Sequence, residues 1–205
     1  MSLETLIFFS VGNPGPATRH STGHIMLRYL QDYFDLRELT KKAQYSITKT
    51  SNNGIILVKS NSYMNESNKA LKQFLDGERI KLNESSVLVI LYDDFENNLG
   101  KVKISTFKKN ESHNGIKSIQ NLISSKYNTA TVYKLGIGIG PKPHKASKDT
   151  MSSWVLSKFN AEEAKVLEDT SFDLLTDYMD EIIERDGEIG DCNKFNAHMT
   201  KITSP

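Results

Sequence analysis

Four polar clusters hold the side chains of this chain that could carry out chemistry. They are Asn13 with His20, Met64-Asn65, Asp93-Asp94 and His113-Asn114. A histidine can act as a general base near neutral pH, a carboxylate can orient it, and amides can bind polar groups of a substrate. Each cluster lies where a predicted strand ends or a predicted helix begins, and in open α/β sheets such positions share one rim where ligands bind.

Each cluster also has a structural explanation. A loop histidine such as His20 is more often structural or solvated than catalytic. An aspartate after a strand more often caps a helix or pairs with a lysine, Asn114 fits the N-cap of a helix, and Met64 fits core packing. The clusters therefore indicate a site only when they are considered together.

The glycine-rich segment before His20 does not match a nucleotide-binding loop. Gly12-Asn13-Pro14-Gly15 lacks the three spaced glycines of a dinucleotide fingerprint, and the chain has no Walker loop and no Gly-x-Ser-x-Gly elbow. Pro14 and Gly15 instead predict a type II turn that presents Asn13, with Gly15 at positive φ. A metal site formed by His20, His24 and Asp93 is a weaker alternative, because the segment lacks the glutamate of a metalloprotease helix.

Strand patterns alternate with helix patterns along the chain, which predicts a three-layer α/β domain. The predicted strands cover residues 6–11, 45–49, 55–59, 87–91, 101–106 and 131–139. Predicted helices begin near Ser21, at a Ser67 cap, at an Asn114 cap and at Asn160, the last ending at Asp186-Gly187. Residues 142–150 are predicted to form a mobile loop. With no internal repeat and no linker, residues 1–205 are expected to form one domain.

The composition is that of a globular intracellular protein. The chain has 205 residues, 38% of them hydrophobic, and its single cysteine, Cys192, excludes an internal disulfide framework and indicates a reducing compartment. No apolar run is long enough to span a bilayer, and the first ten residues lack the basic region of a signal peptide. A reducing intracellular compartment is therefore expected.

The net charge of +1 hides a strong asymmetry. Residues 101–150 hold ten lysines against Glu111 and Asp149, whereas residues 151–191 hold three basic against twelve acidic residues. Such a division can mark a face that binds a polyanion, or it can be a solvated lysine surface. Charge alone does not decide between these interpretations.

The ordered set of motifs resembles the bacterial-type peptidyl-tRNA hydrolase family, and in its C-terminal third the eukaryotic members of that family. Order and spacing agree over about residues 5–185. The matching motifs are Gly12-Asn13-Pro14-Gly15, Thr18-Arg19-His20, Gly23, Tyr63-Met64-Asn65, Asp93-Asp94, Gly100-Lys101-Val102, His113-Asn114-Gly115, Ile137-Gly138-Ile139-Gly140 and Trp154-Val155-Leu156.

The resemblance implies a fold and an activity. The expected fold is a single three-layer α/β sandwich with a twisted mixed β-sheet flanked by helices, without a metal or an organic cofactor. The expected activity is hydrolysis of the ester that links a peptide to the 3′ end of tRNA, which recycles tRNA from aborted translation. The expected partner is peptidyl-tRNA, with no membrane and no obligate protein partner, so a monomer is expected. A eukaryotic member of the family could serve the mitochondria or the cytoplasm, so either localisation is expected.

The resemblance also implies roles for individual residues. His20 would be the general base for water, and Asp93 would hold its productive tautomer. Asn13 would position the substrate or the water, and Asn114 would stabilise the tetrahedral intermediate. The remaining expected contacts are Tyr63, Met64, Asn65 and His113 with the substrate, and Lys101, Lys103 and Lys134 with tRNA phosphates.

The chain departs from the family pattern at several positions. The loop between Gly15 and His20 is about three residues shorter than usual, and residues 108–112 replace a glycine-rich run. Ser105 and Gly136 stand where the family carries a lysine and an arginine that contact phosphates. A non-catalytic, splicing-factor-like RNA-binding protein on the same fold is therefore the main alternative to the enzyme.

Overall fold

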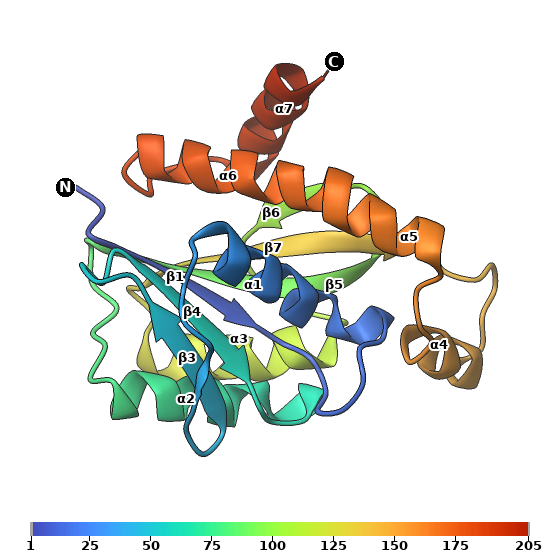
Figure 1. Cartoon of the computed structure of the whole chain (residues 1–205), viewed down its shortest axis with the longest axis horizontal. Helices are drawn as coiled ribbons and strands as arrows, with labels where there is room; N and C mark the ends of the chain where they lie inside the picture. Colours follow the sequence, from blue (N-terminus) through green and yellow to red (C-terminus); the bar gives the residue numbers. More distant parts are fainter. Residues whose placement is uncertain (1, 205) are drawn as a thin grey trace.

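The computed structural model describes residues 2–204 and has three layers, with a mixed sheet between two layers of helices (Figure 1). In that part of the chain the sheet has seven strands in the order β2-β3-β4-β1-β5-β7-β6. The strand and helix bounds, in chain order, are β1 Thr5–Ser10, η1 Arg19–Ser21, α1 Thr22–Tyr33, β2 Thr40–Lys41, β3 Tyr45–Lys49, β4 Ile55–Ser60, η2 Met64–Glu66, α2 Ser67–Gly77, β5 Ser86–Asn98, β6 Val102–Ser105, α3 Asn114–Lys126, β7 Thr131–Gly140, α4 Lys148–Val155, α5 Ala161–Val166, η3 Leu167–Ser171, α6 Phe172–Glu184 and α7 Cys192–Thr203.

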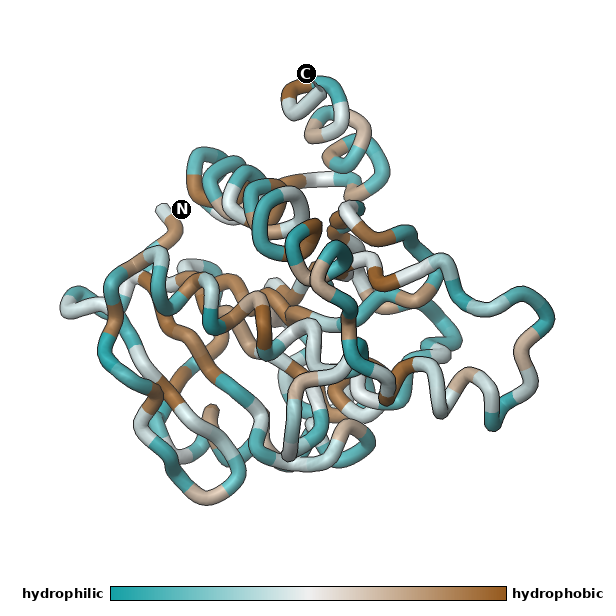
Figure 2. The backbone as a smooth tube through the Cα atoms, turned by 45° about the vertical axis from the view of Figure 1, so that its right-hand side comes forward, coloured by the Kyte–Doolittle hydropathy of each residue, from teal (hydrophilic) through white to brown (hydrophobic). Residues whose placement is uncertain are grey.

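The central strands are apolar on both faces because helices cover both faces. Along β1, alternate residues enter different cores: Phe8 packs with helices α1, α6 and α7, and Phe9 packs with α2 and α3. Parallel pairing places Phe8 beside Leu57 of β4 and Val89 of β5, in the same core. Figure 2 shows hydrophobic residues gathered along the strands inside the molecule. The predicted three-layer mixed α/β sandwich is confirmed.

Parallel pairing also brings together the carboxyl ends of the strands, near which candidate site residues lie. Strand β1 runs parallel to β4 and β5, and β5 runs parallel to β7, so these four strands end on the same side of the sheet. Strands β3 and β6 are antiparallel to their neighbours. The predicted hairpin 45–49/55–59 and the predicted edge strand near 101–106 are both present.

Several predicted boundaries are wrong. Strand β5 was expected to end near Leu91 but continues to Asn98 alongside β7, so Asp93 lies within the strand. Ser67 is the first residue of α2 rather than its cap, and its hydroxyl donates to the Met64 carbonyl. Helix α3 is capped by His113, so Asn114 occupies its first turn. The expected mobile loop 142–150 includes the start of α4.

The C-terminal region forms a long helix in three parts. The expected capping box of Asn160 and Glu163 begins α5, and Gly187, with φ of +80°, follows the end of α6. A π-helical turn, η3, joins α5 to α6. The sequence did not predict α7, which packs Phe195 into the core, or the short β2. No helix among residues 2–204 is both long and apolar enough to cross a membrane.

Candidate active site

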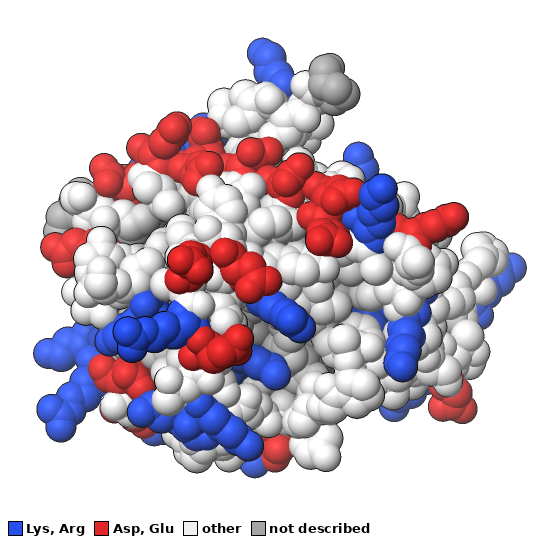
Figure 3. All heavy atoms as spheres, viewed as in Figure 1, with Lys and Arg blue, Asp and Glu red and all other residues white. Residues whose placement is uncertain are grey.

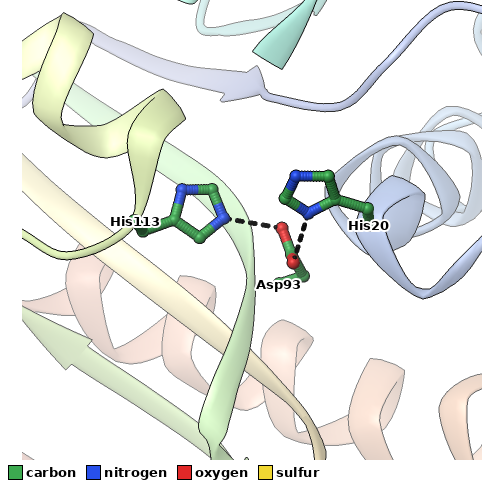
Figure 4. A group of neighbouring side chains, drawn as sticks. All are labelled: His20, Asp93 and His113. Atoms are coloured by element: carbon green, nitrogen blue, oxygen red, sulfur yellow. Dashed lines mark hydrogen bonds and ion pairs between the residues drawn. The ribbon is translucent and has the colours of Figure 1, made fainter. Parts of the chain in front are cut away.

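Asp93 lies on β5 between two histidines, just past the end of the neighbouring strand β1 (Figure 4). Its Oδ2 is 2.7 Å from Nδ1 of His20, and its Oδ1 is 2.8 Å from Nε2 of His113. The carboxylate is fully buried, whereas the side chain of His20 is 17% exposed. The arrangement therefore leaves Nε2 of His20 available to a water molecule or a substrate.

Three elements position these side chains. Asp93 belongs to β5, His20 to the short η1 before α1, and His113 caps α3. Helix α1 can approach the sheet because Gly23 lies against the Leu91 carbonyl, where a Cβ would come within 2.4 Å of the oxygen. This close approach brings His20, three residues earlier, beside Asp93.

Asp93 determines the protonation of the pair. Burial raises the pKa of Asp93, but the charges and hydrogen bonds of His113 and His20 outweigh it, and the net shift is downward. Burial lowers the pKa of His20, but the hydrogen bond and negative charge of Asp93 outweigh it, and the net shift is upward. Asp93 is therefore ionised at neutral pH and makes His20 a stronger base.

His113 has its tautomer set by the fold. Its Nδ1 accepts the Ile116 backbone N–H at 3.4 Å, so the proton lies on Nε2 and is donated to Asp93. Among residues 2–204, His20, Asp93 and His113 are grouped closely enough to hold a metal. The proton on Nε2 of His113 would have to move before that atom could bind a cation, so the arrangement favours a carboxylate held by two hydrogen bonds over a metal site.

His24 lies outside this group, contrary to the alternative of a metal held by His20, His24 and Asp93. Its Nδ1 is 2.7 Å from the buried Ser10 hydroxyl. Burial, together with the positive charge of Lys59, lowers the pKa of His24 to about 3. Its ring packs against Gly12, where a Cβ would come within 2.5 Å. His24 therefore supports the backbone before Asn13.

A cleft of about 330 Å³ next to His20 contains most of the predicted substrate contacts. The Asn13 carboxamide accepts the Met64 backbone N–H at 2.8 Å, which joins the loop after β1 to η2. Gly15 has the expected positive φ, at +113°. The residues that line this cleft are Asn13, His20, Tyr63, Met64, Asn65, Asn114, Ser152, Val155 and Leu156.

A second cleft, of about 620 Å³, shares His20, Asn114, Ser152 and Val155 with the first. Sequence reasoning did not identify most of its lining. Three of the missed residues are lysines. The others include Phe95 and several residues of α4. The local signals were the match at Trp154-Val155-Leu156 and the density of lysines. The lysines are Lys142, Lys145 and Lys148.

The three predicted phosphate contacts differ in accessibility. Lys101 and Lys103 are exposed at β6. Lys134 is 1% exposed, and its Nζ pairs with Glu111 at 2.5 Å and lies 5.7 Å from the centre of the Tyr92 ring. A side chain held in this way cannot reach a phosphate, so that prediction for Lys134 is wrong.

Comparisons with known proteins identify the family and the fold. Residues 7–203 match the family model described as peptidyl-tRNA hydrolase. The peptidyl-tRNA hydrolase of Lactobacillus acidophilus is 34% identical over 197 residues, which cover 93% of this chain and 99% of the relative. The probable peptidyl-tRNA hydrolase of Schizosaccharomyces pombe is 32% identical over 172 residues, which cover 81% of this chain and 77% of that relative. The crystal structure of peptidyl-tRNA hydrolase from Acinetobacter baumannii, 23% identical, has the same fold, with a TM-score of 0.74 and coverage of 96% and 97%.

Proposed function

This chain belongs to the peptidyl-tRNA hydrolase family, and we propose that it hydrolyses the peptidyl-tRNA ester with His20 as the general base. The observation that carries the proposal is the hydrogen bond from His20 Nδ1 to the buried Asp93. This bond keeps the proton on Nδ1 and the lone pair on Nε2. A base with a raised pKa facing a cleft is suited to activating water.

In the proposed mechanism, His20 Nε2 takes a proton from water as the water oxygen attacks the ester carbonyl. Asp93 stabilises the imidazolium that forms, and Asn114 donates a hydrogen bond to the developing oxyanion. The imidazolium then returns its proton to the departing ribose oxygen. Asn13 and Asn65 orient the substrate, with Tyr63 and Met64 along the wall of the cleft.

The energetic demand on these groups is modest because an ester is easier to cleave than an amide. General-base assistance typically contributes about 10²–10⁴-fold, and a well-placed oxyanion donor contributes about 10²–10³-fold. No covalent nucleophile is required. The expected substrate contact of His113 stays a prediction, because its side chain lines the second cleft but is only 5% exposed; in this proposal its main role is to hold Asp93 in position.

For the tRNA, we propose phosphate contacts from Lys101 and Lys103. The three lysines of the second cleft add positive charge beside His20. Many of the acidic residues lie elsewhere: Figure 3 shows a row of them along α5 and α6, near the upper edge of that view, whereas Glu96 pairs with Lys142 at 2.7 Å. This division supports the interpretation of the basic region as a polyanion-binding face. We propose that the chain works as one domain, as a monomer, in the cytoplasm or mitochondria.

The test is release of free tRNA from an N-acetyl-aminoacyl-tRNA by the wild type, His20→Ala and a control, His198→Ala. His198 lies on α7 and pairs with Glu181. We expect His20→Ala to lose about 10²–10⁴-fold in kcat, and His198→Ala to match the wild type. Equal rates for His20→Ala and the wild type would refute the general-base role. A folded wild type without hydrolysis would refute the proposed function.

A further inference from the structure

Helix α4 forms the roof of the candidate active site, yet it has little packing of its own. Ser152 and Val155 line both clefts beside His20. None of the residues of α4 is buried. Because burial of apolar surface is the main force that holds a helix in place, the position of α4 must depend on other contacts.

Those contacts converge on Arg19, which binds Ser157 and Glu163. We call this set of contacts the Arg19 clasp. The Arg19 backbone N–H donates to the Ser157 carbonyl at 2.9 Å, and its Nε donates to the Ser157 hydroxyl at 3.0 Å. Its Nη2 donates to both carboxylate oxygens of Glu163, at 2.9 and 2.8 Å. The clasp therefore holds the segment that directly follows α4.

Two aromatic rings enclose the same guanidinium. Its central carbon lies 5.5 Å from the centre of the Trp154 ring, which belongs to α4, and 4.8 Å from that of Phe159. The Arg19 side chain is only 11% exposed, so water screens these charges much less than it screens a surface pair. A charge-assisted pair of this kind constrains geometry more strongly than an exposed ion pair does.

The Arg19 clasp also connects α4 to the proposed general base, His20. Arg19 directly precedes His20, and both lie in η1, a single turn. We propose that Arg19 is a positioning residue that fixes the roof helix α4 at a set distance from His20, and thereby controls binding of the 3′-terminal part of the substrate. This inference rests on the proposed function, because it assigns the two clefts beneath α4 to that substrate.

Glu163→Gln is the sharpest test. Glutamine keeps an oxygen that can cap the Asn160 N–H, as Glu163 does at 2.9 Å, but it removes the charge that Arg19 binds. Glu162→Gln is the matched control, because Glu162 is the exposed neighbour in the same first turn of α5 and makes the same charge change. Arg19→Lys, which keeps the charge but loses the planar guanidinium, is a second variant.

We expect Glu163→Gln and Arg19→Lys to raise KM about tenfold while kcat changes by less than about threefold, because the loosened roof weakens substrate binding. The acid limb of the pH profile should not move, since the charge next to His20 is that of Asp93. Glu162→Gln should match the wild type in all three quantities. A lower melting temperature with unchanged KM in the two clasp variants would mean a purely structural role and would overturn the inference.

Amide hydrogen exchange gives a readout that does not depend on hydrolysis. Residues 148–157 should exchange faster in Glu163→Gln than in the wild type or Glu162→Gln, while the strands remain protected. Equal exchange in all three proteins would refute the clasp, whatever their activity. If the wild type releases no tRNA, the proposed function fails, and the exchange experiment still decides whether Arg19 holds α4.

Discussion

Replacing Asp93 with asparagine would test the hydrogen-bond arrangement at the centre of the site. The carboxylate accepts one hydrogen bond from His20 and one from His113, whereas a carboxamide offers one acceptor and one donor. One imidazole must therefore present a lone pair. His113 is not free to do so because its Nδ1 already accepts the Ile116 N–H. The new amide donor must face His20, which moves the proton of that ring to Nε2.

A proton on Nε2 removes the general base without removing the histidine. General-base catalysis is worth about 10²–10⁴-fold, and the equivalent substitution in serine proteases costs about 10⁴-fold. We therefore expect kcat/KM of Asp93→Asn to fall about 10³–10⁴-fold, or about 4–5 kcal/mol of transition-state stabilisation. Asp94→Asn is the matched control, since its oxygens accept from Glu96 and Asn97 rather than from a histidine.

The assay is kcat/KM for release of free tRNA from N-acetyl-aminoacyl-tRNA, measured across pH. In the wild type the rate should decline about tenfold per pH unit below the pKa of His20, because only the neutral ring accepts a proton. That pKa is raised above 6.5 by Asp93, so the decline should begin above pH 6.5. In Asp93→Asn the negative charge is lost, burial and the amide donor both favour the neutral ring, and the acid limb should move to lower pH. Activity within tenfold of the wild type, with an unmoved acid limb, would refute the reasoning.

Two further predictions separate the exposed lysines from the buried one. Lys101→Glu with Lys103→Glu should raise KM and flatten its dependence on salt concentration while kcat changes little, because two phosphate contacts are lost; an unchanged salt slope would place those contacts elsewhere. Lys134→Met should remove the ion-pair partner of the buried Glu111 carboxylate, which then keeps only the Lys108 backbone N–H, and lower the free energy of unfolding in urea by about 3 kcal/mol, while the salt slope stays the same. A flatter slope in Lys134→Met would contradict its assignment as a buried structural lysine.

The central strands were predictable because a run of mainly apolar residues marks each of them in the sequence. Apolar runs such as residues 6–11 and 87–91 can be stable only when buried, and the structure places them at the centre of the sheet. Their ends were less predictable. Strand β5 continues past Leu91 because its backbone pairs with β7, and backbone pairing carries no side-chain signal. In the same way, the sequence could not show which of two adjacent polar residues, His113 or Asn114, caps α3.

The candidate site was predictable only in part. Its residue types followed from the order of the motifs, but the contact of His20 with Asp93 joins residues 73 positions apart, and no local spacing specifies it. The burial of Lys134 depends on Glu111, 23 residues earlier, in a segment that departs from the family pattern. The Arg19 clasp likewise joins distant parts of the chain, since Arg19 and Glu163 are 144 positions apart.

Because of the π turn η3, the position of Glu163 relative to Arg19 depends on the number of residues in the helix formed by α5, η3 and α6. A π turn contains about one residue more than an α turn, so it rotates α5 by about 100° relative to α6. Helix α6 is fixed by buried residues such as Leu175 and Ile182, and the face that α5 presents therefore depends on η3. A one-residue deletion in the loop before α4 would shorten only that loop. The same deletion within Leu167–Ser171 would turn Glu163 away from Arg19, so this helix tolerates changes of residue type more readily than changes of length.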